Sequence, residues 1–379
     1  MRFSRLQSGY VRSFESLFGC RSLLCAWLRT CVLIVFAAAP FAQASVSLLL
    51  EQPYGKLNTF APAGHSAIYL DHVCAETPLK LRPCRPGELG VVLSRYNHVG
   101  GRDWVAMPLI PYLYAVDSIG EIPETIDRDG EQRLREVYRE QYLQTIAPTL
   151  ANGSAPGGNW TQLVGSAFDR TIYAFRVNTT AEQDARLIAY FNDRHNVEGY
   201  NGAFRNCADF TRVTLNHFYP HAIRRNYIAD FGLTSPKSVA RSLSHYAAKH
   251  PGTGFEVFVI PQIKGELPRS HSNTDLVEGI LKRYGVPLVV VSPISTAVVL
   301  AAYLGHGRFS MPKHVPILNL AELSSNESSD AMVRSSPLAV PVLPGASFIL
   351  LPAPASTWTL PIAPSSIRQV SLVDTGVVP

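Results

Sequence analysis

The 379-residue sequence is poor in charge, because Asp, Glu, Lys and Arg make up only 17% of it. Its 34 Lys and Arg exceed its 29 Asp and Glu, which gives a net charge of +5. No cluster of basic residues interleaved with aromatic residues is present, although that pattern is what contacts phosphates and bases. The sequence therefore predicts no nucleic-acid partner.

Familiar metal and phosphate motifs are also missing. The sequence has no Cys-x-x-Cys pair and no His-Glu-x-x-His motif, which are two common signatures of zinc sites. The glycine pair at 100–101 is not followed by Gly-Lys-Ser/Thr, so it does not form a phosphate-binding loop. We therefore expect neither a bound metal nor a cofactor.

The N-terminus has the pattern of a secretory leader. Five arginines precede an apolar run, CVLIVFAAAPFAQA, that closes on Ala42-Gln43-Ala44. A basic flank, a short apolar core and small residues at the exit are typical of a signal peptide. We expect cleavage after residue 44 and export to the periplasm or cell envelope, with an uncleaved signal anchor as the alternative. Cleavage would remove five Arg and one Glu, leaving a net charge of about +1.

Few cysteines remain once the leader is removed. Three of the six lie in residues 1–44, and the others are Cys74, Cys84 and Cys207. Cys74 and Cys84 bracket a short proline-rich loop, and an exported chain can form disulfides. We expect these two to pair, the alternative being two free thiols. Cys207 is then left over, and an unpaired thiol in an exported protein is of functional interest.

Hydrophobic patterning predicts an α+β domain over residues 45–270, with an antiparallel sheet packed on helices. Runs rich in β-formers favour strands, and apolar residues recurring every three or four positions favour helices. Thr180 and Asn206 as cap residues, and Pro236 near a first helical position, mark three helix starts. We expect strands at 46–55, 65–71, 89–96, 170–178 and 255–263, and helices at 129–148, 180–194, 206–219 and 236–249.

The C-terminal third is different in character. Residues 286–304 carry no charge and are long enough to cross a bilayer, so we expect a transmembrane segment within residues 271–310. The alternative is a buried apolar hairpin broken at Pro293. Residues 311–379 are rich in Pro, Ser and Ala, which predicts a loose tail.

Cys207 is predicted to begin a helix. Asn206 is a good N-cap, which places Cys207 in the first turn, where free N–H groups and the helix dipole favour a thiolate. Asp209 opposes this, so we expect only a modest lowering of the thiol pKa. The alternative is a small buried hydrophobic residue, which is a common role of free cysteine.

His65 provides the second half of a candidate site. It follows Gly64 at the start of the strand HSAIYLD. A thiol nucleophile on a helix start needs an imidazole base nearby in space, and a strand start is a suitable position for one. Without a partner, His65 would be an ordinary polar residue.

The two segments GHSAIYL and YNGAFRNCADF, in this order, resemble the circularly permuted papain-like proteins, which include NlpC-related permuted hydrolases and the lecithin retinol acyltransferase group. The resemblance covers roughly residues 46–265. It implies a permuted papain-like fold with Cys207 as nucleophile and His65 as base. Gly64, Tyr69, Tyr200, Asn201 and Asn206 match the remaining motif positions.

The resemblance also implies a third polar residue that orients the imidazole from the following strand. The Cys74–Cys84 loop interrupts the spacing. If Cys74 and Cys84 face each other across a hairpin, His65 lies opposite about position 93. Ser94 and Tyr96, which share one face, are then the nearest candidates, together with His98.

These observations predict an exported thiol hydrolase or acyltransferase that acts on an amide or ester bond of an envelope peptide or lipid. A non-catalytic protein that keeps the fold and binds an envelope ligand is the alternative. The sequence leaves the oligomeric state and the substrate open.

Overall fold

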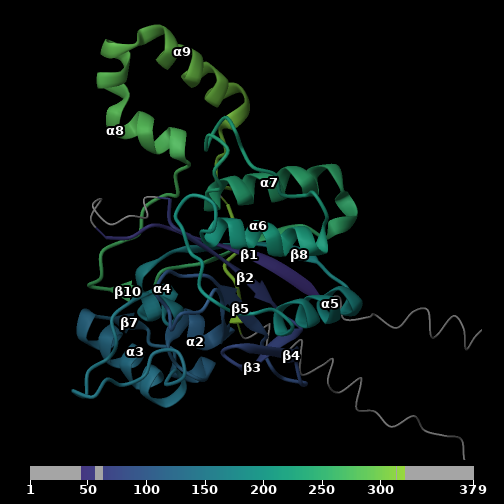
Figure 1. Ribbon diagram of the computed structural model, residues 1–379, viewed down its shortest axis with the longest axis vertical. Coiled ribbons are helices and arrows are strands. Elements are labelled where there is room, and N and C mark those ends of the chain that lie inside the picture. Colours follow the sequence, from purple (N-terminus) through teal and green to yellow (C-terminus); the bar gives the residue numbers. More distant parts are fainter. Residues whose placement is uncertain (1–43, 56–62, 313, 321–379) are drawn as a thin grey trace, which may run out of the picture. The chain divides into compact units, whose positions relative to one another are not determined.

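The computed structural model describes residues 44–55, 63–312 and 314–320 (Figure 1). The predicted leader, apart from Ala44, lies outside the described residues, and so does the predicted tail from residue 321 onwards. All of the described residues belong to one compact unit, whose bounds are Met1–Ser335.

A six-stranded sheet forms the centre of this unit, in the order β6-β5-β2-β1-β8-β9. Every neighbouring pair is antiparallel. Its strands are β1 (Ser45–Glu51), β2 (His65–Leu70), β5 (Val91–Ser94), β6 (Val105–Pro108), β8 (Ile172–Asn178) and β9 (Glu256–Ile260). Each strand that the sequence predicted is present, and β6 is an addition.

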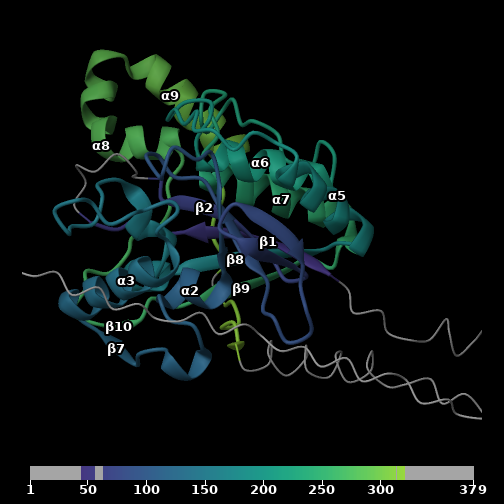
Figure 2. The same ribbon diagram turned by 60° about the horizontal axis from the view of Figure 1, so that its bottom comes forward.

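Helices cover both faces of the sheet (Figures 1 and 2). Because side chains alternate along a strand, Leu49 and Ala67 pack toward one set of helices while Leu48 and Ile68 pack toward the other. The first set comprises α2 (Leu109–Tyr114), α3 (Arg128–Tyr142) and α4 (Ser166–Asp169), and the second comprises α5 (Ala181–Asn192), α6 (Cys207–Phe218) and α7 (Pro236–Lys249). The predicted α+β class is therefore confirmed.

Smaller elements lie around this core. The proline-rich loop forms its own antiparallel pair, β3 (Val73–Thr77) with β4 (Lys80–Pro83), and β7 (Thr125–Ile126) pairs in parallel with β10 (Lys264–Gly265). Short helical turns occur at Ile119–Glu121, Asn159–Leu163, Pro251–Thr253 and Tyr303–Gly307. At the start of the predicted tail, Ile317 forms a parallel bridge with Val259 of β9.

The prediction of a transmembrane segment at 286–304 is wrong. The apolar stretch is divided between two helices, α8 (Leu276–Val291) and α9 (Pro293–Ala302), and Ser292 separates them. Pro293 lacks an N–H and cannot continue the hydrogen bonding of α8. Within the described residues, no helix combines the length and hydropathy needed to cross a bilayer. The alternative, a buried hairpin broken at Pro293, is confirmed in the position of the break. It is wrong about burial, since Val286 and Ile294 are 80% and 79% exposed.

Candidate functional site

Helix α6 begins at Cys207, as the sequence predicted, because Asn206 caps it. The Asn206 side-chain oxygen accepts the Asp209 N–H at 2.9 Å, and its amide donates to the carbonyls of Gly202 and Thr234, both at 3.1 Å. The Phe210 N–H bonds to the Asn206 carbonyl at 3.1 Å. The first-turn N–H groups that this cap does not use are those of Cys207 and the next residue.

The Cys207 thiol is buried against the start of β2. Cys207 is only 8% exposed, and hydrogen bonding by the backbone and the hydroxyl of Ser66 acts to lower the pKa of its thiol. Burial raises the pKa of Cys207, and the hydrogen bonds from Ser66 only partly offset this. The expected lowering of the thiol pKa is therefore wrong in sign, because desolvation outweighs the favourable position at the helix start.

The charge of Asp209, two positions after Cys207, is compensated by its hydrogen-bond partners. Asp209 is 3% exposed, and its carboxylate accepts hydrogen bonds from Arg225 and from the hydroxyl of Thr234, each at 2.8 Å. Charge compensation of this kind limits how far Asp209 opposes a thiolate on Cys207. Burial first, and then the charge of Cys207, raise the pKa of Tyr200, in the segment before α6, to about 12.

His65 begins β2, as predicted, and its ring is held by stacking. The ring lies flat on that of Tyr96, with 3.9 Å between centroids and 9° between planes. Burial, and after it the positive charge of Arg170, holds the pKa of His65 well below its usual range. The imidazole is therefore neutral near pH 7, and its Nε2 has no hydrogen-bond partner among the described residues.

Gly64 is required immediately before this histidine. It adopts a φ of +79°, a region that residues with side chains rarely occupy. A Cβ atom there would lie 2.2 Å from the carbonyl oxygen of Glu51. The close approach of the two strand ends therefore depends on the glycine that precedes His65.

A buried charged cluster lies beside His65, and the sequence reasoning missed it. Glu51 is directly opposite His65 in the β1–β2 register, is fully buried, and accepts a hydrogen bond from Tyr112 of α2. Arg170 lies 3.2 Å from its carboxylate. Burial raises the pKa of Glu51 even though the Arg170 charge lowers it. The signal in the sequence was an acidic residue that directly follows the apolar strand SVSLLL.

This cluster acts electrostatically on Cys207 as well. The charge of Glu51 raises the pKa of the thiol and that of Arg170 lowers it, after the larger effects of burial and Ser66. Cys207 in turn contributes to the raised pKa of Tyr96, for which burial is the main cause. Cys207 therefore shares one electrostatic environment with the residues that surround His65.

Of the candidates for a third residue, Tyr96 contacts the imidazole, through the stacking of the two rings. The β2–β5 register pairs Ile68 with Leu93, and the same antiparallel register continued along the strands brings His65 opposite Tyr96. The predicted partner near position 93 is wrong, because the loop folds as a separate hairpin and does not extend the β2–β5 ladder. Ser94 is buried on β5, with no hydrogen-bond partner for its hydroxyl among the described residues. His98 is 75% exposed at its side chain.

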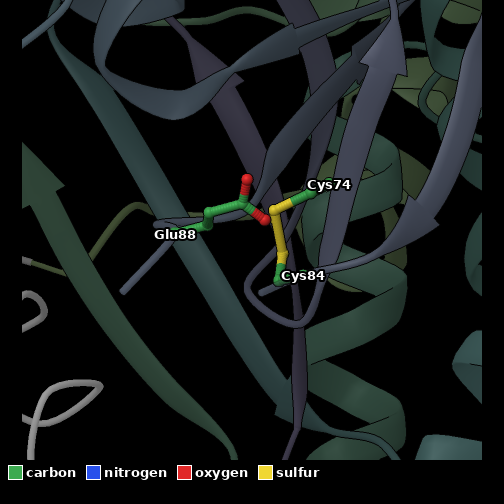
Figure 3. A group of neighbouring side chains, drawn as sticks. All are labelled: Cys74, Cys84 and Glu88. Atoms are coloured by element: carbon green, nitrogen blue, oxygen red, sulfur yellow. A yellow bond between two sulfur atoms is a disulfide. The ribbon is translucent and has the colours of Figure 1, made fainter. Parts of the chain in front are cut away.

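The predicted Cys74–Cys84 disulfide is present and accounts for the other two cysteines (Figure 3). With Glu88 these cysteines form, among the described residues, a group whose ligand atoms lie within 4.8 Å of one another, the spacing of a metal site. The two terminal guanidinium nitrogens of Arg82 each donate to the Glu88 carboxylate at 2.6 Å. While the sulfurs are bonded to each other they offer no thiolate, so the chemistry of this group is that of a disulfide beside an ion pair.

In comparisons with known proteins, no family model, no curated protein and no solved structure matches this chain. The arrangement of the site is therefore interpreted from its own geometry. Helix α6, which begins with the thiol, packs on β2, which begins with the neutral imidazole, and a buried carboxylate–guanidinium pair lies beside that imidazole.

Proposed function

We propose that this protein is a thiol-dependent hydrolase or acyltransferase that acts on an amide or ester carbonyl, with Cys207 as nucleophile and His65 as base. The observation that carries the proposal is that Tyr96, whose ring stacks on His65 with 3.9 Å between centroids, also has its pKa raised by the charge of Cys207, after burial and Glu51. The sequence resemblance to permuted papain-like proteins supports the same assignment. The direct pairing of the Cys207 thiol with the His65 imidazole stays a prediction.

The chemistry starts from a neutral pair. As the Cys207 sulfur bonds to the substrate carbonyl carbon, the thiol proton moves to the neutral His65 imidazole. The charge that develops on the carbonyl oxygen is stabilised by the first-turn N–H groups that the Asn206 cap leaves free. The bond to the amine or alcohol then breaks, and His65 returns the proton to that leaving group. Water or an acceptor attacks the thioester and restores the thiol.

In this mechanism Tyr96 is a positioning residue. Its ring fixes the plane of the His65 imidazole by stacking, whereas the usual third residue in such sites orients the imidazole through a hydrogen bond. Burial first, and then the positive charge of Arg170, lower the pKa of His65, so the imidazole is neutral near pH 7. The Glu51 carboxylate, 3.2 Å from Arg170, places a group of opposite charge in the same cluster.

A second candidate is a non-catalytic protein that binds a ligand of the cell envelope. The low exposure of Cys207 and its raised pKa favour this reading, since a reactive cysteine is usually exposed and acidic. In either case an envelope location is proposed from the leader sequence, and the Cys74–Cys84 disulfide is compatible with it.

The test is turnover of chromogenic p-nitrophenyl esters and peptide anilides, combined with the intact mass of the protein during reaction. We expect Cys207→Ser and His65→Gln to abolish turnover, and the double variant to be little worse than either. His98→Gln, at an exposed histidine, is the matched control. An acyl adduct should appear on the peptide that contains Cys207. Full turnover by Cys207→Ser would disprove the proposal, and a lack of both turnover and adduct would favour the binding protein.

A further inference from the structure

The α8–α9 hairpin carries an apolar surface that the domain does not cover. No Asp, Glu, Lys or Arg occurs between Arg283 and Arg308. Within this stretch, five side chains are between 63% and 82% exposed: Val286, Val290, Val291, Ile294 and Val298. A helix that is apolar all round is normally buried, and a contiguous exposed apolar patch marks an interaction site.

The base of the hairpin, in contrast, is tied to the domain. The Lys237 ammonium of α7 pairs with Glu278 at 2.5 Å, and the Val277 N–H donates to the Ala229 carbonyl at 2.8 Å. Tyr303, beyond α9, donates its hydroxyl to Asp275 at 3.0 Å. These contacts fix the position of the base, so the exposed valines belong to an anchored element.

The polar backbone at the bend is satisfied inside the hairpin. The Ser292 N–H donates to the Leu288 carbonyl at 2.9 Å, and the Thr296 hydroxyl lies 3.0 Å and 2.8 Å from the carbonyls of Leu288 and Ser292. The Ser292 and Ser295 hydroxyls bond to each other at 2.9 Å. Internal pairing of this kind is what a hydrocarbon environment requires, because lipid tails offer no hydrogen bonds.

Basic and aromatic residues flank the apolar stretch. Lys282 and Arg283 precede it and Arg308 follows it. The Arg283 guanidinium lies 5.6 Å from the ring centre of Tyr284, which is 50% exposed. Tyrosine and basic side chains are enriched where a protein meets lipid headgroups, and basic residues are attracted to anionic lipids.

The lengths of the helices decide how deep the hairpin reaches. Helix α8 has 16 residues and α9 has 10, which correspond to about 24 Å and 15 Å at 1.5 Å per residue. The hydrocarbon core of a bilayer is about 30 Å thick. We propose that the α8–α9 hairpin docks the protein on an anionic lipid bilayer, with residues 286–298 in the acyl region of one leaflet.

The experiment is co-sedimentation of the full chain with vesicles of phosphatidylcholine, with and without phosphatidylglycerol. Val290→Asp/Ile294→Asp should lower the vesicle partition coefficient about tenfold or more. A tenfold change corresponds to about 1.4 kcal/mol, and a carboxylate in the hydrocarbon region costs more than that. Val137→Asp/Val197→Asp, at exposed valines elsewhere, is the matched control. All variants carry the same leader, so its contribution cancels in the comparison. Equal binding by the two double variants would overturn the proposal.

Basic residues and competing occupants are tested separately. Arg283→Gln/Arg308→Gln should lower binding only to vesicles with phosphatidylglycerol, and unchanged binding would refute an electrostatic role. With benzoylphenylalanine in place of Val290, illumination on vesicles should yield phospholipid adducts. Adducts with a second copy of the chain, or with residues 321–379, would show instead that protein covers the patch and would refute the lipid proposal. None of these outcomes depends on Cys207.

Discussion

The pH dependence of Cys207 alkylation tests the site most directly, because the structure determines its sign. An ordinary thiol has a pKa of about 8.5, and burial raises that of Cys207. His65 is neutral near pH 7, since burial and Arg170 lower its pKa. The resting site is therefore a neutral thiol beside a neutral imidazole, unlike the thiolate–imidazolium pair of many cysteine enzymes.

The size of the effect follows from the ionised fraction. An unperturbed thiol is about 3% ionised at pH 7, and each unit by which its pKa rises lowers that fraction about tenfold. Cys207 should react with iodoacetamide at pH 7 at less than about a thirtieth of its limiting rate, and the rate should still rise at pH values above 9. Mass spectrometry of the Cys207 peptide, with the urea-unfolded chain as reference, measures this.

Ser66 gives the sharpest variant for this assay. Ser66→Ala removes the side-chain hydrogen bond that lowers the pKa of Cys207 and leaves the backbone one in place. A hydrogen bond to a charged group contributes about 1.5–3 kcal/mol, so the alkylation profile should move to higher pH by about one to two units. Thr211→Ser is the control, because it keeps the hydroxyl that lies 3.2 Å from Ser66. A rate plateau below pH 7, or a shift to lower pH in Ser66→Ala, would refute this reasoning.

Three further outcomes are expected. In the folded protein the pKa of His65 lies below its ordinary value of about 6.5. The neutral ring therefore stabilises the fold above that ordinary pKa, and this stabilisation is lost as the pH falls through the folded-state pKa. Urea midpoints should therefore drop more steeply below pH 6 for the wild type than for His65→Gln, and parallel curves would contradict this. Replacing Cys74 and Cys84 by Ser opens a loop with a sequence separation of 10 and should cost about 2–3 kcal/mol, or roughly 5–10 °C in Tm; an unchanged Tm would show that the disulfide does not stabilise the fold. Asn206→Ala removes the α6 cap and should cost about 1 kcal/mol in urea unfolding, with much of it recovered in Asn206→Ser; equal midpoints for all three chains would contradict the capping role.

The helices next to the site were predictable because their ends carry local signals. Asn206 caps α6, and Ser235 with Pro236 starts α7 within the range read from the sequence. Such signals act over three or four residues, so one sequence is enough to recognise them. The β2–β5 register was not predictable in this way, because it depends on how the intervening loop folds, and the loop forms a hairpin of its own.

The candidate site was only half visible in the sequence, for a physical reason. Cys207 and His65 stand out through residue type and position. Glu51 and Arg170 do not, because a charged residue at a strand end is usually solvated. Only the register that places β1 between β2 and β8 buries them as a pair. The apolar character of residues 286–304 and a possible break at Pro293 were recognised, but hydropathy does not show that the two helices remain exposed.

Two short segments connect the base of the hairpin to the site. On one side, the Asn273 amide donates to the carbonyls of Glu51 at 2.8 Å and Ala63 at 3.0 Å, and Asp275 caps α8 two residues later. On the other side, Ala229 accepts the N–H of the second residue of α8, and Thr234, five residues on, bonds to Asp209 in α6.

If the hairpin docks on lipid and Cys207 is the nucleophile, docking should affect the catalytic site through these hydrogen bonds. The turn before His65 is hydrogen-bonded to Asn273, in the segment that leads into α8. The start of α6 is hydrogen-bonded to Thr234, in the segment whose Ala229 accepts a hydrogen bond from α8. A bilayer that orders the hairpin therefore also restrains both halves of the site, and preorganised groups react faster. Anionic vesicles should raise the turnover of a water-soluble ester by the wild type and leave that of Val290→Asp/Ile294→Asp unchanged. Equal stimulation of both would show that lipid acts on the substrate or the site without the hairpin.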